Sequence, residues 1–264
     1  MSILQKILVR SCAYIMLTLN FFSCQKLNYL DPNPNQITIG VIGASLIEPA
    51  NGWVEMACKK LSIGCINRAI GGDLTFNAAQ RFYKNEYFTQ KELQNIDILL
   101  IQFANCKDVC GNQDSLLPTT QDYTNSYTEF SDQLFREYNY AQQMDYIIKK
   151  WQEICRENNT PMHIIFVTHW HDSRATYNES VRKLAARWNA DVLELDKNIG
   201  FSKEEPLPDG TQPSIRYAMD TETINGIVYG YHPLRNKEGE YIQNRMASIL
   251  LKKLKSYIPE HNIK

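Results

Sequence analysis

Four positions in the sequence carry residue types that serve together in acyl-transfer chemistry: Ser45, Gly72, Asn105 and His232. A serine hydroxyl is a weak nucleophile until a neighbouring imidazole accepts its proton. The oxyanion that forms when the hydroxyl attacks a carbonyl then needs N–H donors around it. Ser45 and His232 are therefore candidate catalytic residues, and Gly72 and Asn105 are candidate parts of an oxyanion hole.

The surrounding hydrophobic pattern predicts the elements that would position these residues. Apolar runs typical of strands occupy residues 37–42, 64–66, 97–103, 161–168 and 191–195, and apolar residues recur with helical spacing between and after them. Strands that alternate with helices predict a parallel sheet with helices on both faces. Ligands of such sheets bind outside the carboxyl ends of the strands, so we expect Ser45, Gly72 and Asn105 to meet at that edge.

The same stretches resemble the motif blocks of the SGNH hydrolases, the GDSL esterase and lipase superfamily, over most of residues 37–255. The resemblance implies that Ser45 is the nucleophile and that Gly72 belongs to the oxyanion hole. In the third block the asparagine aligns with position 105 or 106, and we choose Asn105 because only its amide donates strongly. The implied fold is a three-layer α/β/α sandwich with a central five-stranded parallel, flavodoxin-like sheet, and no cofactor or metal is expected.

The last block differs from the family pattern, which has an aspartate three residues before the histidine. Tyr229 stands at that place before His232. An acid normally orients the imidazole and stabilises its cation. From the residues alone, this role could pass to Asp220, to Glu222, to a backbone carbonyl or to no group. The expected mechanism therefore uses Ser45 and His232, and the group that orients His232 stays open.

The N-terminal residues are typical of an export signal. Lys6 and Arg10 precede an apolar stretch, 12–22, that is short for a bilayer span. Ser23-Cys24 resembles the lipobox of bacterial lipoproteins, which implies that Cys24 is lipidated. We predict a signal peptide over 1–23, a lipidated tether over 24–36 and one hydrolase-like domain over 37–264 with an insertion at about 110–140. The alternative is a first helix packed into the core.

Composition excludes several classes of protein. The 264 residues are 44% hydrophobic and 22% charged, unlike wholly disordered, collagenous or polytopic membrane proteins. The net charge of −1 provides no positive field that would attract nucleic acid. Bridges between Cys58 and Cys65 or between Cys106 and Cys110 are both open at this stage.

One further motif resembles a set of metal ligands. His169, His171 and Asp172 follow the fourth predicted strand at the same edge of the sheet. Histidine and carboxylate side chains are common metal ligands. We expect these residues to line the substrate site or to lie on the surface rather than to bind a metal.

The expected function is that of an exported serine esterase in the bacterial cell envelope, on the periplasmic or outer-membrane face. By analogy with surface-anchored members of the superfamily, it would remove acetyl or other small acyl groups from carbohydrate. The Tyr-rich segment 123–140 suits stacking against sugars better than it suits a lipid tunnel. Its partners would be an acylated carbohydrate or other small ester and the membrane, through the lipid anchor only. The alternative is an inactive lipoprotein of the same fold that binds glycans.

Overall fold

A computed structural model of the chain describes residues 37–49, 52–104, 140–200, 205–235 and 240–258. The chain divides into two units, Met1–Leu30 and Asp31–Lys264, and every described residue belongs to the second. The predicted signal peptide, the tether and the predicted insertion up to residue 139 lie outside the described residues, whereas Tyr140, its last residue, begins a helix. Within the described part, no helix has both the length and the apolar character needed to cross a membrane.

The central sheet contains the five predicted strands in the predicted flavodoxin-like arrangement. Its strands are β1 (Thr38–Gly43), β2 (Gly64–Asn67), β3 (Ile98–Gln102), β4 (Ile164–Val167) and β5 (Asp191–Leu193). They lie in the order β2-β1-β3-β4-β5, and every neighbouring pair is parallel. This is the flavodoxin-like order of a doubly wound sheet. Strand β3 is apolar along most of its length because helices cover both of its faces, and the predicted fold class is confirmed.

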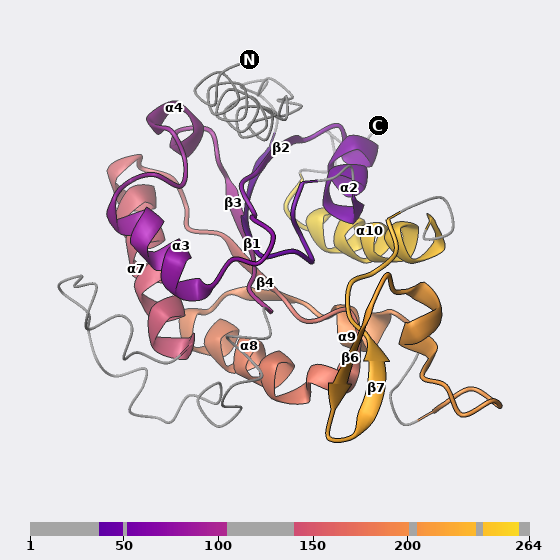
Figure 1. Cartoon of the computed structure of the whole chain (residues 1–264). Helices are drawn as coiled ribbons and strands as arrows, with labels where there is room; N and C mark the ends of the chain where they lie inside the picture. Colours follow the sequence, from indigo (N-terminus) through magenta and orange to yellow (C-terminus); the bar gives the residue numbers. More distant parts are fainter. Residues whose placement is uncertain (1–36, 50–51, 105–139, 201–204, 236–239, 259–264) are drawn as a thin grey trace, which may run out of the picture. The chain divides into compact units, whose positions relative to one another are not determined.

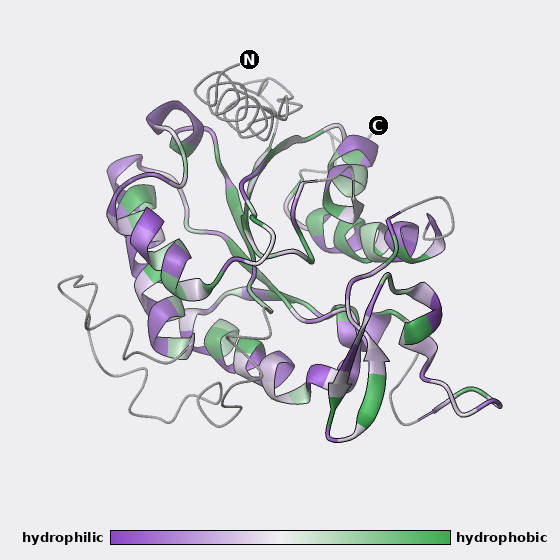
Figure 2. Cartoon of the chain, in the orientation of Figure 1, coloured by the Kyte–Doolittle hydropathy of each residue, from purple (hydrophilic) through white to green (hydrophobic). Residues whose placement is uncertain are grey.

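The helices form the two outer layers. They are α2 (Trp53–Leu61), α3 (Thr75–Tyr83), α4 (Gln90–Leu93), α7 (Tyr140–Glu157), α8 (Ala175–Trp188), α9 (Leu195–Asn198) and α10 (Glu240–Leu254), with 3₁₀ turns at Asp172–Arg174 and Pro213–Tyr217. Helices α2 and α10 pack against each other on one face of the sheet, and α3, α7 and α8 cover the other (Figure 1). Their hydrophobic sides face the sheet (Figure 2), as the 3.6-residue periodicity predicts.

A two-stranded antiparallel hairpin, which the sequence analysis did not identify, lies outside this sheet (Figure 1). It consists of β6 (Thr221–Ile224) and β7 (Ile227–Gly230). Its two-residue turn is Asn225-Gly226, with φ values of 51° and 80°. Positive φ at both turn residues is the type I′ geometry that favours Asn-Gly. The hairpin brings the chain just before β6 next to the chain just after β7.

Candidate active site

Ser45 lies in the turn that follows β1, at the carboxyl edge of the sheet. The Ala44 N–H donates to the carbonyl of Gln102 on the neighbouring strand at 3.0 Å. A Cβ on Gly43 would lie 2.3 Å from that same carbonyl oxygen, so the close approach of the two strands requires glycine at position 43. This packing fixes the start of the turn, and Ser45 itself is partly exposed.

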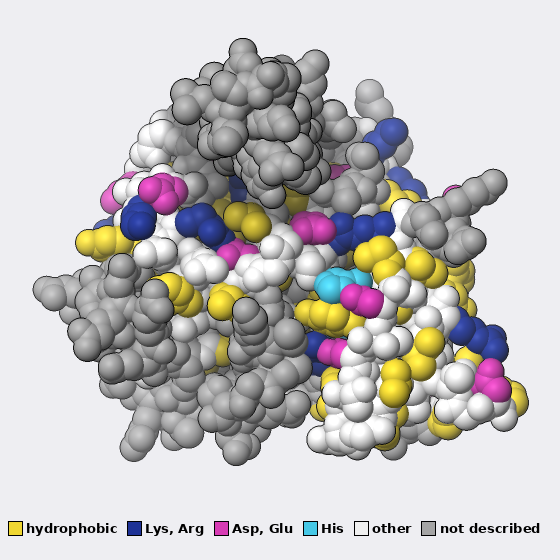
Figure 3. Space-filling view, viewed as in Figure 1, with side chains coloured by type: hydrophobic (Ala, Val, Ile, Leu, Met, Phe, Trp, Pro, Cys, Tyr) yellow, Lys and Arg dark blue, Asp and Glu magenta, His cyan; other side chains and the backbone are white. Residues whose placement is uncertain are grey.

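The structure brings Ser45 and His232 into direct contact. The Oγ of Ser45 and the Nε2 of His232 lie 2.7 Å apart. The Nδ1 of His232 lies 2.7 Å from Oδ2 of Asp220, and the other oxygen of Asp220 accepts the backbone N–H of His232 at 2.8 Å. With the Nδ1 proton donated to the carboxylate, Nε2 is free to accept the serine proton. On this face of the molecule a histidine side chain is visible directly beside an acidic side chain (Figure 3).

Asp220 reaches His232 because the pairing of the hairpin continues beyond its two strands. The Tyr231 N–H donates to the carbonyl of Asp220 at 2.9 Å, and the Met219 N–H donates to the carbonyl of His232 at 2.7 Å. The acid therefore comes from the opposite strand, 12 positions upstream. The sequence left four alternatives for the group that orients His232, and in the structure Asp220 is the group in contact with its ring.

Tyr229, at the family's aspartate position, and Glu222, the other candidate acid, make contacts with other residues. Tyr229, which stands where the family pattern has aspartate, is 4% exposed and stacks on His171 with the ring centroids 6.0 Å apart. Glu222 pairs with the buried guanidinium of Arg174, whose Nε donates to it at 3.0 Å. The acid that contacts His232 therefore comes from the chain just before β6 and not from the position that the family pattern gives it.

Gly72 lies in the loop after β2, at the same edge of the sheet as Ser45. The loop runs alongside the end of β1, since the Ile70 N–H donates to the carbonyl of Gly43 at 3.0 Å. It then turns back with a φ of 75° at Gly72, a conformation that glycine adopts without strain. The backbone N–H groups of Ser45 and Gly72 make no hydrogen bond to any other described residue. Asn105, the third predicted donor, lies outside the described residues.

The His169–His171 motif supports the segment that carries His232. The indole N–H of Trp170 donates to the carbonyl of Tyr231 at 2.7 Å, and Nε2 of His171 donates to the carbonyl of Gly230 at 2.6 Å. His169, Trp170 and His171 are all at most 2% exposed. The expectation that these histidines lie on the surface or line the substrate site is wrong, because their rings fill the space under the end of β7.

Three side chains in this region have the geometry to approach one metal ion. One ligand atom from each of His169, His171 and Glu222 lies within 4.8 Å of the other two. However, His171 already uses both ring nitrogens, since Nδ1 accepts the hydroxyl of Ser173 at 2.6 Å. Both oxygens of Glu222 accept from Arg174. A metal ion would have to displace these partners and would lie beside the Arg174 charge, so the cluster fits support of the His232 segment better than metal binding.

Burial controls the protonation of the two histidines. It lowers the pKa of His171 to about 3 and the pKa of His169 well below its usual range. Both rings are therefore neutral at pH 7. Both ring nitrogens of His169 are buried without a hydrogen-bond partner. A neutral ring is the form that tolerates this environment.

The cysteines of the described region are reduced. Cys58, Cys65 and Cys155 are free thiols, so the bridge between Cys58 and Cys65 that the sequence left open is not formed here. Contact with Cys58 and burial raise the pKa of the Cys65 thiol. Cys106 and Cys110 lie outside the described residues.

Comparisons with known proteins give one family and several solved structures. A family model described as "Domain of unknown function (DUF5040)" matches residues 36–258, and the comparison with curated proteins gives no match. A protein described as an SGNH hydrolase from Slackia heliotrinireducens is 15% identical with a TM-score of 0.49, and the match covers 83% of this chain and 100% of that chain. The lipase Lip_vut3 from a goat rumen metagenome is 14% identical with a TM-score of 0.46, covering 81% and 96%. The acetyl xylan esterase AlAXEase is 14% identical with a TM-score of 0.45, covering 83% and 100%.

Proposed function

We propose that this chain, which belongs to the DUF5040 family, is a serine esterase in which Ser45, His232 and Asp220 form the catalytic triad. The observation that supports this most directly is the unbroken series of hydrogen bonds from the Ser45 hydroxyl through both ring nitrogens of His232 to the Asp220 carboxylate. Groups in this order at these distances activate a serine hydroxyl. The family description names no activity, so the proposal depends on this geometry.

In the proposed acylation step, Ser45 Oγ attacks the carbonyl carbon of the ester while Nε2 of His232 takes the hydroxyl proton. The tetrahedral intermediate places its negative oxygen toward the unpaired backbone N–H groups of Ser45 and Gly72. Asn105 is proposed as a third donor. His232 then gives its proton to the departing alcohol, which leaves an acyl group on Ser45.

Deacylation repeats these steps with water. His232 takes a proton from the attacking water molecule. When the intermediate collapses, the bond between the carbonyl carbon and Ser45 Oγ breaks, His232 returns the proton to Oγ, and the carboxylic acid is released. Asp220 stabilises the imidazolium in both halves of the reaction and keeps Nε2 directed at Ser45. Because the same carboxylate also holds the backbone N–H of His232, ring and main chain are oriented together.

The proposed substrate is an acetylated or otherwise acylated carbohydrate. The side chain of His232 is 20% exposed and that of Asp220 is 50% exposed. A catalytic group this close to solvent suits a polar, extended substrate that approaches along the surface. A fatty acyl ester would instead be expected to need an apolar channel that buries its chain.

The proposed location is the bacterial cell envelope. The motif at Ser23-Cys24 supports lipidation of Cys24 after removal of residues 1–23. The sequence 24–36 would then be a tether between the lipid and the catalytic domain. An anchored esterase of this kind would act on carbohydrate at or near the membrane surface.

The test of the catalytic proposal is covalent labelling of Ser45 by a fluorophosphonate, which reacts only with an activated serine. The purified chain should be labelled and should hydrolyse p-nitrophenyl acetate and acetylated xylan. We expect Ser45→Ala to abolish labelling and to lower kcat by at least about 10³-fold, and His232→Ala to do nearly the same.

The matched control is Ser248→Ala, which removes an exposed serine hydroxyl on α10 that bonds only to its own helix. This variant should retain full labelling and activity. If the wild type and Ser45→Ala showed equal residual rates and neither was labelled, the alternative of a glycan-binding protein without activity would replace this proposal.

A further inference from the structure

The turn that carries Ser45 is held by side chains from three separate parts of the chain. They donate to its consecutive carbonyl groups: Arg235 to Ser45, Trp53 to Leu46 at 3.2 Å, and Asn67 to Ile47 at 2.8 Å. A turn of this kind has few internal backbone bonds, so external donors decide the direction of its carbonyls. The orientation of the nucleophile therefore depends on residues outside the turn.

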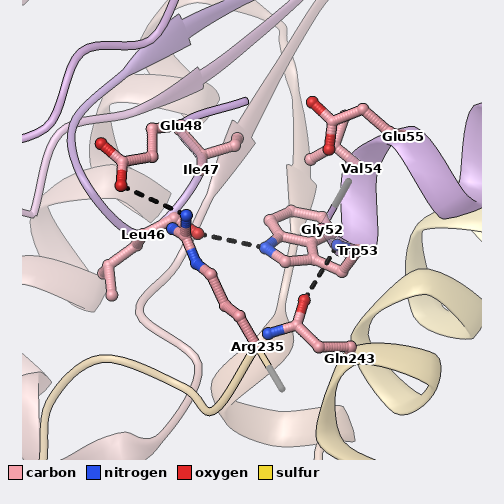
Figure 4. Close-up of a pocket in the computed structure, with 9 residues that line it drawn as sticks. All are labelled: Leu46, Ile47, Glu48, Gly52, Trp53, Val54, Glu55, Arg235 and Gln243. Carbon is pink, nitrogen blue, oxygen red and sulfur yellow. Dashed lines mark hydrogen bonds and ion pairs between the residues drawn. The ribbon is translucent and has the colours of Figure 1, made fainter. Parts of the chain in front are cut away.

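Arg235 differs from the other two donors because it lies only three residues after His232. One terminal nitrogen of its guanidinium donates to the carbonyl of Ser45, and the other pairs with Glu48 Oε1 at 3.2 Å. Figure 4 shows Arg235 reaching from the chain before α10 to Glu48 at the end of the turn. This side chain thus joins the segment of the base to the turn of the nucleophile.

Glu48 extends the same contact to the oxyanion loop. A Cβ built on Gly71 would lie 2.3 Å from Oε2 of Glu48, so the carboxylate rests directly on the backbone of Gly71. The next residue is Gly72, whose N–H is a proposed oxyanion donor. One ion pair therefore contacts the turn of Ser45, the segment of His232 and the loop of Gly72.

The crevice beside this pair is too small to be the substrate site. Its empty volume is about 180 Å³, and it is lined by residues of the turn and of α2 together with Arg235 and Gln243 (Figure 4). Neither Ser45 nor His232 lines it. The side-chain oxygen of Gln243 accepts the backbone N–H of Trp53 at 2.9 Å, and its side-chain NH₂ donates to the carbonyl of Leu234 at 2.8 Å. The polar atoms of Gln243 thus bond to other groups of the protein and not into the crevice.

We infer that the Glu48–Arg235 pair is a positioning device that sets the nucleophile turn, the His232 segment and the oxyanion loop relative to one another. The inference rests on the proposed esterase function. The planar guanidinium serves two acceptors at fixed angles, which a lysine ammonium cannot reproduce. The side chains of Arg235 and Glu48 are 17% and 35% exposed, and ion pairs near the surface contribute little to global stability. The pair therefore acts on catalytic geometry more than on folding.

The experiment compares Arg235→Met, Arg235→Lys and Glu48→Gln with the wild type in steady-state esterase kinetics and in the rate of fluorophosphonate labelling. We expect Arg235→Met to lower kcat and the labelling rate by about 10²-fold, the size of effect that a misplacement of about 1 Å produces, with KM changed less than threefold. Arg235→Lys should recover part of this loss, and Glu48→Gln should have an intermediate effect. The urea midpoint of unfolding should shift little in all three.

The control is Arg182→Met, which breaks the ion pairs of Arg182 with Glu194 and Asp196, where the three side chains are 22%, 33% and 6% exposed. This variant should keep its kcat. The double variant Glu48→Arg with Arg235→Glu separates the two contacts of Arg235, because it restores opposite charges but leaves no donor at 235 for the Ser45 carbonyl. We expect it to remain impaired.

The outcomes separate the inference from the proposed function. An active, labelled wild type with an equally active Arg235→Met would overturn the inference alone. Recovery of full activity in the charge-exchanged double variant would also overturn it, since the donation to Ser45 would then be dispensable. A wild type that is neither active nor labelled would overturn the proposed function, and the inference with it.

Discussion

At the scale of single residues, the carboxylate of Asp220 has the most demanding set of contacts in the site. One oxygen accepts from the ring of His232 and the other from its backbone N–H. Because one carboxylate accepts both hydrogen bonds, it fixes both the tautomer and the orientation of the imidazole. Burial plays a small part here, since half of the Asp220 side chain is exposed.

Asp220→Asn tests this role. An amide can present its NH₂ to Nδ1 of His232, which stabilises the tautomer with the proton on Nε2 and leaves no base for Ser45. We expect kcat to fall by about 10³ to 10⁴-fold, with the far-UV circular dichroism spectrum unchanged. The control Asp209→Asn alters a more exposed carboxylate that accepts from Thr211 and should keep its kcat. A kcat for Asp220→Asn within threefold of the wild type would contradict the role of Asp220.

At the scale of elements, the hairpin β6–β7 determines where the acid and the base meet. Its last residue, Gly230, is tightly enclosed, because a Cβ there would lie 2.4 Å from the carbonyl oxygen of Ser214 and 2.5 Å from Cβ of Ala218. The Gly230 N–H also donates to the Ser214 hydroxyl at 2.9 Å. Trp170 and His171 hold the same end of β7 from below. The position of His232 is therefore set two residues earlier, by contacts on both sides of the strand end.

Gly230→Ala should displace this end of β7, since the nearest atoms are backbone atoms of Ser214 and the Cβ of Ala218, none of which can rotate aside. We expect kcat to fall by about 10², together with a clear loss in the free energy of unfolding. The control Gly226→Ala lies in the same hairpin, with φ at 80° but no atom within 4 Å of the added Cβ. It should cost about 1 kcal/mol of stability through backbone strain alone and reduce kcat far less. Equal kcat values for the two variants would show that enclosure of Gly230 does not position His232.

At the scale of the whole molecule, stability depends on pH through the buried histidines. Burial lowers the pKa of His171 from its ordinary value of 6.5 to about 3. Between these values the unfolded chain binds a proton that the folded chain does not, so the free energy of unfolding falls as the pH falls. His169 acts in the same direction. The folded state is thus favoured above pH 6.5 and progressively loses this contribution below it.

His171→Gln removes one titrating group while keeping an N–H donor for the carbonyl of Gly230. At pH 5 the His171 contribution lost by the wild type is about 2 kcal/mol, from a shift of 1.36 kcal/mol per pKa unit. Urea unfolding at pH 7.5, 6 and 5 should therefore show a weaker pH dependence in the variant. Parallel curves for the two proteins would contradict this origin of the acid sensitivity.

The proposed anchor also belongs to the whole molecule. Cys24→Ala removes the thiol that lipidation requires, so the variant should leave the membrane fraction and lack the mass of a diacylglycerol group. Cys58→Ala, which removes a buried thiol of the catalytic domain, should partition as the wild type does. Membrane association of Cys24→Ala, together with an unprocessed N-terminus on the wild type, would contradict the lipoprotein proposal.

Features that depend on neighbouring residues were predictable from the sequence. Apolar runs bounded by turn residues located all five strands, and their alternation with helices predicted the doubly wound sheet. The placement of Ser45 and Gly72 at one edge followed, because the carboxyl ends of parallel strands share an edge. The acid was also within reach of local reasoning, since Asn225-Gly226 is a hairpin signal and a turn centred there places residue 220 opposite residue 231.

The tertiary structure decided the features that depend on contacts between distant segments. Asp220 and Glu222 have the same chemistry and nearly the same position in the sequence, and only the packing of His232 and Arg174 around the hairpin decides which carboxylate each of them contacts. The burial of His169 and His171 and the contact of Arg235 with the carbonyl of Ser45 are likewise long-range. Periodicity reports which face of an element is apolar, whereas the identity of a hydrogen-bond partner depends on the packing of elements far apart in the chain.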